Sequence, residues 1–288
     1  ASDVYKRQAW DMCRDAEMNS ADYIDLVSRG IGVESDLTAV GSLTRQAQTA
    51  ATAYTLPEQR DVVRDALVSA MVLQLKEAEP GSDHQLAFAN AIARGVHDVE
   101  GAELLRAWLG GEEVPEGLRI DTDMRWRLVT ALARLGRADE ALITAELAHD
   151  KTIGGTQAAA GARAAMNTAR AKAEAWRLAT ADPEIANETH RAVCLEFQQF
   201  DQREVLEPYR EKYLQMAEAI SAGRDGWERR GVAAITTALA LLFPVDADQD
   251  WVDRVDEWLV QSSPSETVRR SVTERRDALA RALRCQRA

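Results

Sequence analysis

The sequence predicts an all-α protein, specifically an irregular superhelix, or α-solenoid, of HEAT-like helix pairs. Apolar residues recur at spacings of three and four over most of the 288 residues, which is the period of one α-helical face. Glycine and proline are sparse, and helix breaks come about every 15 to 20 residues without a strict repeat. Few stretches alternate with period two, so we expect almost no sheet.

The first part of the chain is predicted to form a series of amphipathic helices. Ser20 caps a helix that ends at Gly30, and the polar segment 34–36 opens the next. Pro57 starts a third helix, because proline in the first turn gives up no intrahelical hydrogen bond. Two more helices are expected over 86–92 and 99–109. The apolar stripes of the first three are Tyr23, Leu26 and Val27; Leu37, Val40, Leu43 and Ala47; and Val62, Ala66, Ala70 and Leu73.

The middle of the chain carries the clearest pattern of helices and turns. Polar residues at 121–123 offer an N-cap, and Gly136 should stop the helix that follows, because glycine tolerates the left-handed conformation. A second helix follows, Gly154-Gly155 breaks the chain again, and an alanine-rich helical region runs to Trp176. The expected inner stripes are Met124, Leu128, Leu132 and Leu135, then Ala138, Leu142, Ala145 and Ala148.

Further helices are expected after the stop at Asp182-Pro183. They cover residues 189–197, 206–213, 227–243 and 251–260, and a basic terminal helix starts at Pro264. The apolar stretch 232–245 is too short to span a membrane and suits a buried helix. Tryptophans at helical spacings are expected to be packing anchors, namely Trp108, Trp126, Trp176, Trp227, Trp251 and Trp258.

Short motifs are spread over the chain from Ala9 to Trp258. They read Ala9-Trp10-Asp11-Met12, Leu105-Arg106-Ala107-Trp108-Leu109, Asp121-Thr122-Asp123-Met124-Arg125-Trp126, Ala171-Lys172-Ala173-Glu174-Ala175-Trp176 and Leu206-x-Pro208-Tyr209-x-x-Lys212-Tyr213. Together they resemble the C-terminal helical domain of the zinc aminopeptidase N family, most of all its actinobacterial branch. Several separate motifs are harder to obtain by chance than one.

The resemblance implies a parent enzyme in which zinc-activated water removes the N-terminal residue of a peptide. The catalytic domain and its zinc lie upstream of the matched region, so this chain would hold no cofactor and would be inactive alone. Its partners would be the catalytic domain of the same polypeptide and the peptide substrate, whose chamber it would wall. In that family, basic residues of this domain can meet a peptide's C-terminal carboxylate. The candidates here are Arg163, Arg170 and Lys172.

The histidines and cysteines give no sign of a catalytic or metal site. None of His84, His97, His149 and His190 is followed four residues later by a second histidine, so the HExxH zinc motif is absent. His190 and Cys194 are four residues apart, as a thiolate–imidazole pair on a helix requires. No neighbouring residue orients the imidazole, so we interpret them as a chance pair with a buried cysteine.

Charge and cysteine content indicate which partners and which cellular compartment to expect. The formal net charge of −12 disfavours nucleic acid as a partner. The terminal segment 264–288 is locally basic, which we interpret as a solvated helix face. Three cysteines far apart imply no disulfide framework and favour a reducing cytoplasm. No stretch suggests a membrane anchor.

Residues 1–8 do not fit the pattern that begins at Ala9. We therefore expect a non-native or disordered tract over 1–8 and a single domain over 9–288. A second hypothesis is a free-standing α-solenoid that binds protein partners, which the missing polar capping repeat at Ala9 weighs against. A small helical hydrolase has the least support. The isolated chain is expected to self-associate through its exposed interface.

Overall fold

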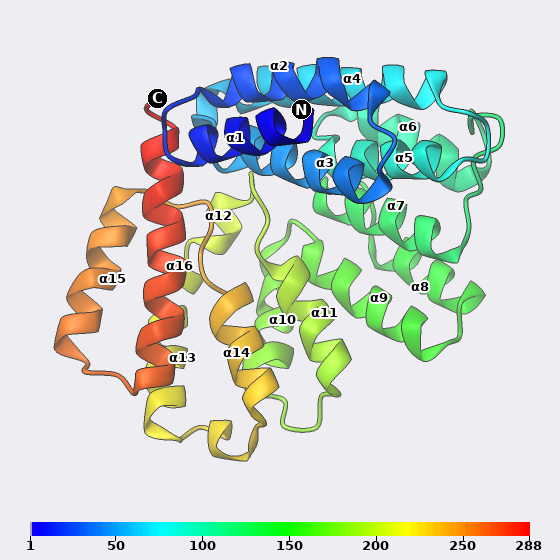
Figure 1. The fold of residues 1–288 in the computed structure, drawn as a ribbon. Coiled ribbons are helices and arrows are strands. Elements are labelled where there is room, and N and C mark those ends of the chain that lie inside the picture. Colours follow the sequence, from blue (N-terminus) through cyan, green and yellow to red (C-terminus); the bar gives the residue numbers. More distant parts are fainter. Residues whose placement is uncertain (1) are drawn as a thin grey trace. The chain divides into compact units, whose positions relative to one another are not determined.

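The structure is a computed structural model that describes the backbone of residues 2–288 and the side chains of residues 7–288. Every regular element in this range is a helix, so the predicted all-α, α-solenoid-like class is confirmed (Figure 1). The chain divides into two compact units, residues 1–131 with 281–288 and residues 132–280. Each unit is described by itself below. The single domain expected over 9–288 stays a prediction.

The first unit is built from antiparallel neighbours that share buried faces. It contains the helices α1 (Ser2–Arg14), α2 (Ser20–Gly30), η1 (Ile31–Val33), α3 (Leu37–Thr52), η2 (Pro57–Gln59), α4 (Arg60–Glu77), α5 (Asp83–Gly95), α6 (Val99–Gly110) and most of α7 (Thr122–Arg134). Helix α3 packs on α2, α4 and α5, and α4 also packs on α5. Residues 2–8 lie in α1, and Ala1 is outside the described residues. That residues 1–8 are non-native stays a prediction.

Two predicted caps and one predicted break are confirmed in detail. Asp36 accepts a hydrogen bond from the Thr38 amide at 2.8 Å at the start of α3. Asp121 accepts one from the Met124 amide at 2.9 Å at the start of α7. Gly136 follows α7 with a φ of 67°, the left-handed conformation expected of a helix stop.

Several predictions in the first unit are wrong, and Leu26 and Leu37 of two predicted stripes are exposed. Asn19 caps α2, accepting from the Ala21 amide, whereas Ser20 is buried and hydrogen-bonds Thr55. On α4 the predicted stripe through Val62 and Leu73 is exposed. Apolar residues occur on both sides of α4, and its packing on α3 and α5 selects the other set, namely Val63, Leu67, Met71 and Leu75.

The second unit continues the all-helical pattern. It contains the end of α7 and the helices α8 (Glu140–His149), α9 (Ile153–Ala165), α10 (Ala169–Ala181), α11 (Asn187–Phe197), α12 (Arg203–Leu206), α13 (Tyr209–Ala222), η3 (Trp227–Arg229), α14 (Val232–Leu241), α15 (Gln249–Gln261) and most of α16 (Glu266–Cys285). Helix α11 packs on both α9 and α14. The close approach of α9 and α11 needs small residues: a Cβ at Gly161 would lie 3.4 Å from the Ala192 carbonyl oxygen.

The predicted chain break at Gly154-Gly155 in the second unit is wrong. Gly154 and Gly155 lie inside the first turn of α9, and the break precedes Thr152, which caps the helix by accepting from the Gly155 amide at 3.0 Å. A Cβ at Gly155 would clash with the Asp150 carbonyl oxygen, so glycine is required there for close approach. The alanine-rich region is two helices, α9 and α10, rather than one.

One further stripe and one helix boundary in the second unit differ from the prediction. On α8 the buried residues are Ile143 and Glu146, whereas Ala145 and Ala148 are exposed, because α8 packs on α9 along one narrow face. The predicted helix over 227–243 divides into the short turn η3 and α14, and Val232 at the start of α14 is exposed.

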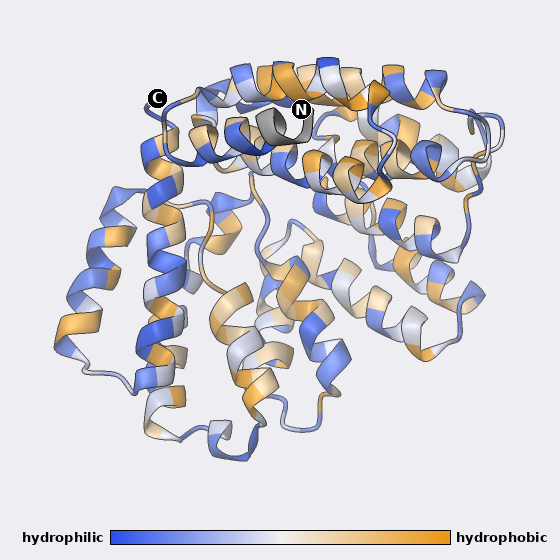
Figure 2. Cartoon of the chain, viewed as in Figure 1, coloured by the Kyte–Doolittle hydropathy of each residue, from blue (hydrophilic) through white to orange (hydrophobic). Residues whose placement is uncertain are grey.

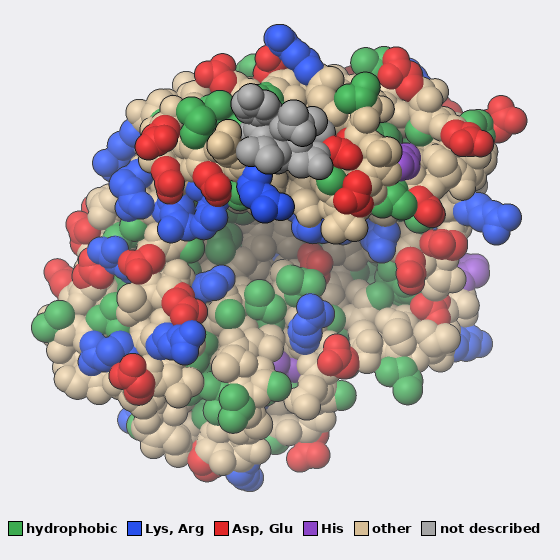
Figure 3. Space-filling view, in the orientation of Figure 1, with side chains coloured by type: hydrophobic (Ala, Val, Ile, Leu, Met, Phe, Trp, Pro, Cys, Tyr) green, Lys and Arg blue, Asp and Glu red, His purple; other side chains and the backbone are tan. Residues whose placement is uncertain are grey.

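Burial of the tryptophans agrees with their predicted packing role. Five are almost completely buried, namely Trp108, Trp126, Trp227, Trp251 and Trp258. Hydrophobic and hydrophilic residues alternate along the helices as amphipathic packing requires (Figure 2). Acidic and basic side chains are interspersed over the visible face (Figure 3). No helix in residues 2–288 is both long and apolar enough to cross a bilayer.

Candidate functional site

The three residues predicted to face substrate lie on α9 and α10. Arg163 of α9 forms a two-pronged ion pair with Glu140 of α8, with Nη2 2.6 Å from Oε1 and Nε 3.0 Å from Oε2. The two side chains are 38% and 60% exposed. An ion pair this exposed contributes little to stability, although it occupies Nε and Nη2 of the Arg163 guanidinium.

Arg170 shares the surroundings of Glu140. The hydrogen bond from Arg163 is the main cause that lowers the pKa of Glu140, and the charges of Arg163 and Arg170 act in the same direction. Arg170 is exposed at the start of α10. The positive charges of two arginines therefore act on one carboxylate, which is an arrangement that also suits a carboxylate from another molecule.

Lys172 lies in different surroundings, although it is only two residues from Arg170. Its side chain is 0% exposed. Its ammonium nitrogen donates to the carbonyl oxygens of Ala164 and Phe197, both at 2.7 Å, and lies 5.3 Å from the centre of the Phe197 ring. Burial lowers the pKa of Lys172 to about 7, and the charge of Glu196 opposes this shift. A substrate-facing role for Lys172 stays a prediction.

Gln202 completes this buried arrangement, although no sequence pattern indicates a role for it. Its side-chain nitrogen donates to the carbonyl oxygens of Arg134 and Ala165, both at 2.9 Å. Lys172 and Gln202 together hold the C-terminal ends of α7, α9 and α11. Helix ends leave carbonyl groups without intrahelical partners, and their partial negative charge favours a cationic donor.

A second, partly buried cation binds the C-terminal end of the next helix. Arg230 donates to the carbonyl oxygens of Ala179 at 2.8 Å and Asp182 at 2.7 Å, at the end of α10. Its guanidinium also lies 4.5 Å from the centre of the Trp227 ring. The basic side chains of this region thus divide into structural groups, Lys172 and Arg230, and exposed groups, Arg163 and Arg170.

His190 and Cys194 do meet, but not as a nucleophile pair. Cys194 Sγ lies 3.5 Å from His190 Nε2, which also lies 3.0 Å from the Ala179 carbonyl oxygen. Burial raises the pKa of the Cys194 thiol to about 12 and lowers the pKa of His190. The two groups are therefore a neutral thiol and a neutral imidazole, both buried.

No metal centre is formed by the residues that the structure describes. In that part of the chain no group of three or more His, Cys, Asp or Glu side chains is arranged to hold a metal ion. His97 Nε2 lies 3.6 Å from Asp61 Oδ1 and 3.5 Å from Asp65 Oδ1. Both carboxylates belong to α4, and neither is that of Asp98, which follows His97 in the sequence.

Comparison with known proteins gives two matches. A model of the ERAP1-like C-terminal domain matches residues 7–281. A protein named Aminopeptidase N from Streptomyces lividans is 42% identical over 279 residues. That alignment covers 96% of this chain and 32% of the relative, so the chain spans about a third of the relative's length.

Proposed function

This chain belongs to the ERAP1-like C-terminal domain family, and we propose that it is the C-terminal helical domain of a zinc-dependent aminopeptidase, which removes N-terminal residues from peptides. The observation that carries the proposal is 42% identity, over 96% of the chain, to a protein named Aminopeptidase N. Since the alignment covers 32% of that relative, the chemistry is assigned to the rest of the same polypeptide.

In this proposal the helices wall the substrate chamber and limit entry to unstructured peptides. A zinc ion in the catalytic domain would polarise the scissile carbonyl and supply the attacking water. The described residues of this chain do not fit as its ligands, because they form no cluster of three metal-binding side chains. No step of peptide hydrolysis is therefore assigned to them.

Arg163 and Arg170 are proposed to bind the peptide's C-terminal carboxylate. Both are accessible, and both already act on the carboxylate of Glu140. A substrate carboxylate would compete with Glu140 for the N–H donors of Arg163, which a guanidinium group presents in a geometry that matches carboxylates. Lys172 would act indirectly, by holding the end of α9, the helix that carries Arg163.

The first test compares the 288-residue chain with the full polypeptide that includes a catalytic domain. The chain alone is expected to be helical by circular dichroism, to contain no stoichiometric zinc and to release no fluorophore from alanyl or arginyl coumarin substrates. The full polypeptide is expected to bind zinc and turn over both substrates. Tight zinc binding with turnover by the chain alone would contradict the proposal.

The second test addresses the two arginines in the full enzyme. Arg163→Gln and Arg170→Gln should raise KM for peptides with a free C-terminus by roughly tenfold, with little change in kcat, since one charge-assisted hydrogen bond is worth about a decade of affinity. C-terminally amidated peptides should be unaffected. Arg177→Gln is the matched control, because Arg177 is also exposed on α10 but pairs with Glu174. Equal effects on free and amidated peptides would exclude carboxylate binding.

Three lesser expectations remain proposals. A free-standing scaffold would capture partners without any catalytic domain, which a pull-down with the isolated chain tests. Self-association of the isolated chain is a proposal that light scattering after size exclusion measures. A cytoplasmic location is supported by the three cysteines, which are free thiols.

A further inference from the structure

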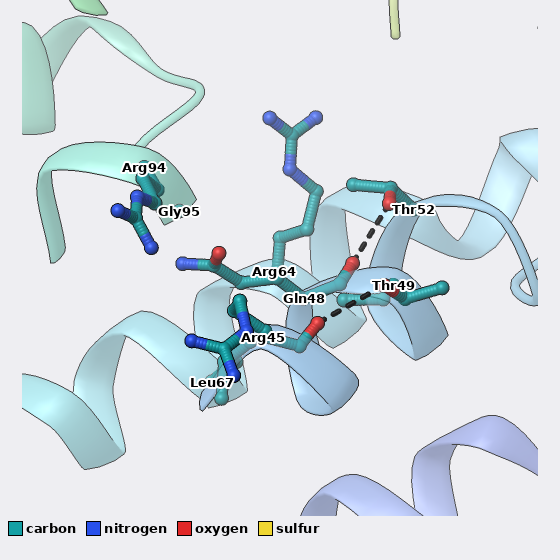
Figure 4. A pocket seen from close by; sticks show the side chains of 9 residues that line it. Arg45, Gln48, Thr49, Thr52, Arg64, Leu67, Arg94 and Gly95 are labelled. Carbon is teal, nitrogen blue, oxygen red and sulfur yellow. Dashed lines mark hydrogen bonds between the residues drawn. The ribbon is translucent and has the colours of Figure 1, made fainter. Parts of the chain in front are cut away.

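Helix α4 of the first unit carries apolar residues on two sides. Its inner side packs on α3 and α5 and buries Val63, Leu67, Met71 and Leu75. Figure 4 shows part of this inner side, where Arg64 and Leu67 line a cavity of about 390 Å³ together with residues of α3 and α5. The inner side of α4 is therefore already covered by its neighbours.

The outer side of α4 carries a second apolar stripe, which is exposed. Val62 is 73% exposed and Leu73 is 53% exposed. Ala66 and Ser69 lie between them and are exposed as well. The four positions follow one another at spacings of four, three and four, so they form one line along the helix, which we call the outer ridge. A helix that is apolar on both sides is typical of a helix that is covered on both sides.

Carboxylates accompany the outer ridge. Asp61 and Asp65 lie one turn apart on α4, and their side chains are 80% and 62% exposed. Glu77 is exposed at the end of the helix. Within α4, which the structure describes in full, the two arginines are buried and Lys76 is the one exposed cation. The surface around the outer ridge is therefore acidic.

This charge favours a cationic partner over a second copy of the chain. The outer ridge of another copy would bring the same excess of carboxylates, and each chain has a net charge of −12, so like charges would repel. Lysine or arginine side chains beside an apolar stripe would instead be attracted to Asp61 and Asp65. Their methylene stems would also cover part of the exposed apolar surface.

The shape of the outer ridge suits a helix. The bulky side chains Val62 and Leu73 are at its two ends, and the small residues Ala66 and Ser69 are between them. Small residues let a second helix approach closely, and lines of side chains at spacings of three and four pack into the grooves of another helix. Apolar anchors at the same spacings are the usual means by which an amphipathic helix binds a protein surface.

We propose that the outer ridge is a docking surface for an amphipathic helix of a partner protein, whose apolar stripe is flanked by lysine and arginine. Val62 and Leu73 would anchor the apolar stripe, and Asp61 and Asp65 would attract its basic flank. The surface is formed within the first unit and does not depend on the proposed peptidase activity of a parent enzyme.

The test is isothermal titration calorimetry of the 288-residue chain with model peptides as long as α4, which has 18 residues. The first peptide consists of leucine and lysine, with the leucines on one helical face. The second has glutamate in place of lysine, and the third has the leucine and lysine residues in scrambled order. The amphipathic leucine–lysine peptide is expected to bind saturably at one site per chain, and the other two at least about tenfold more weakly.

A double variant of the outer ridge locates the binding. Val62→Ser with Leu73→Ser removes the two exposed anchors and should weaken binding of the leucine–lysine peptide by at least about tenfold. Both positions are exposed, so the variant should fold, which circular dichroism checks. The matched control is Val232→Ser with Val260→Ser in the second unit, where the two valines are 75% and 80% exposed. It should leave the affinity unchanged.

Four results would overturn the proposal. The leucine–lysine peptide does not bind saturably, the glutamate peptide binds equally well, or the control variant weakens binding as much as the ridge variant. The fourth is a dimer of the parent chain, detected by light scattering, that the ridge variant does not form, because the outer ridge would then bind a second copy. The same peptide affinity is expected for the full polypeptide that includes a catalytic domain, and loss of binding there would also contradict docking of a partner protein.

Discussion

Lys172 and Gln202 donate to neighbouring carbonyl oxygens at the end of one helix, to Ala164 at 2.7 Å and to Ala165 at 2.9 Å. Each also reaches a second helix end, Phe197 for Lys172 and Arg134 for Gln202. Two side chains thereby provide donors to the ends of α7, α9 and α11. Removal of such a donor is costly, because an unpaired buried carbonyl costs about 1–3 kcal/mol.

Replacing Lys172 with methionine should destabilise the protein. Lys172→Met fills similar space but leaves the Ala164 and Phe197 carbonyl groups without this donor, so the free energy of unfolding should fall by about 2 kcal/mol or more. Urea titration at pH 7 measures the change. Lys151→Met, at an exposed position before α9, is the control and should stay within about 0.5 kcal/mol of the parent chain. Equal stability of both variants would show that Lys172 is not a structural donor.

Stability should rise with pH above neutrality because of Lys172. Its pKa is about 7 in the folded chain against 10.5 in the unfolded reference. Between these values the unfolded state binds the extra proton, so the free energy of unfolding increases with pH, by at most about 1.4 kcal/mol per unit. Below pH 7 this contribution is constant. The difference between the parent chain and Lys172→Met, measured by urea titration from pH 6 to 10, should show the rise, and a flat difference would refute it.

The three cysteines should resist thiol reagents in the folded protein. Cys13, Cys194 and Cys285 are at most 3% exposed. Burial raises the pKa of Cys13 and Cys194 to about 12 and also raises the pKa of Cys285, so almost no thiolate is present at pH 8. We expect 5,5′-dithiobis(2-nitrobenzoate) to react with fewer than one thiol per native chain and with all three in guanidinium chloride. Rapid reaction of the native chain would contradict this burial.

The two adjacent glycines of α9 should respond in opposite ways to alanine. Gly155→Ala places a Cβ against the Asp150 carbonyl oxygen and should destabilise the protein by about 1–3 kcal/mol. At Gly154 the nearest atom to a Cβ is Thr152 Oγ1 at 3.5 Å, an ordinary contact. Gly154→Ala should therefore be neutral or stabilising by up to about 1 kcal/mol, since alanine restricts the unfolded chain. Thermal unfolding compares the pair, and similar effects would show that the clash relaxes.

Local signals in the sequence predicted the helices well. The caps at Asp36 and Asp121 and the stop at Gly136 depend on backbone groups within a few residues, so the sequence alone specifies them. Helical spacing predicted the all-α class for the same reason. The choice of buried face on α4 failed, because apolar residues lie on both sides and only packing on other helices distinguishes them.

The candidate site shows the same division between local and long-range information. The sequence selected Arg163, Arg170 and Lys172 as basic residues near an alanine-rich region, but it could not separate the exposed pair from the buried lysine. The carbonyl group of Phe197, which binds Lys172, is 25 positions away in the sequence, so no local pattern shows that Lys172 is buried. The carbonyl group of Arg134, which binds Gln202, is 68 positions away, so no local pattern indicates Gln202 either.

By itself the sequence determined the helical class and several helix caps and stops, because these depend on neighbours within one or two turns of the chain. Tertiary structure alone decided which basic residues are buried as helix-end donors and which face solvent. It also decided which apolar stripe of α4 is buried and which is exposed. Burial depends on contacts between residues far apart in sequence, and no local pattern encodes those contacts.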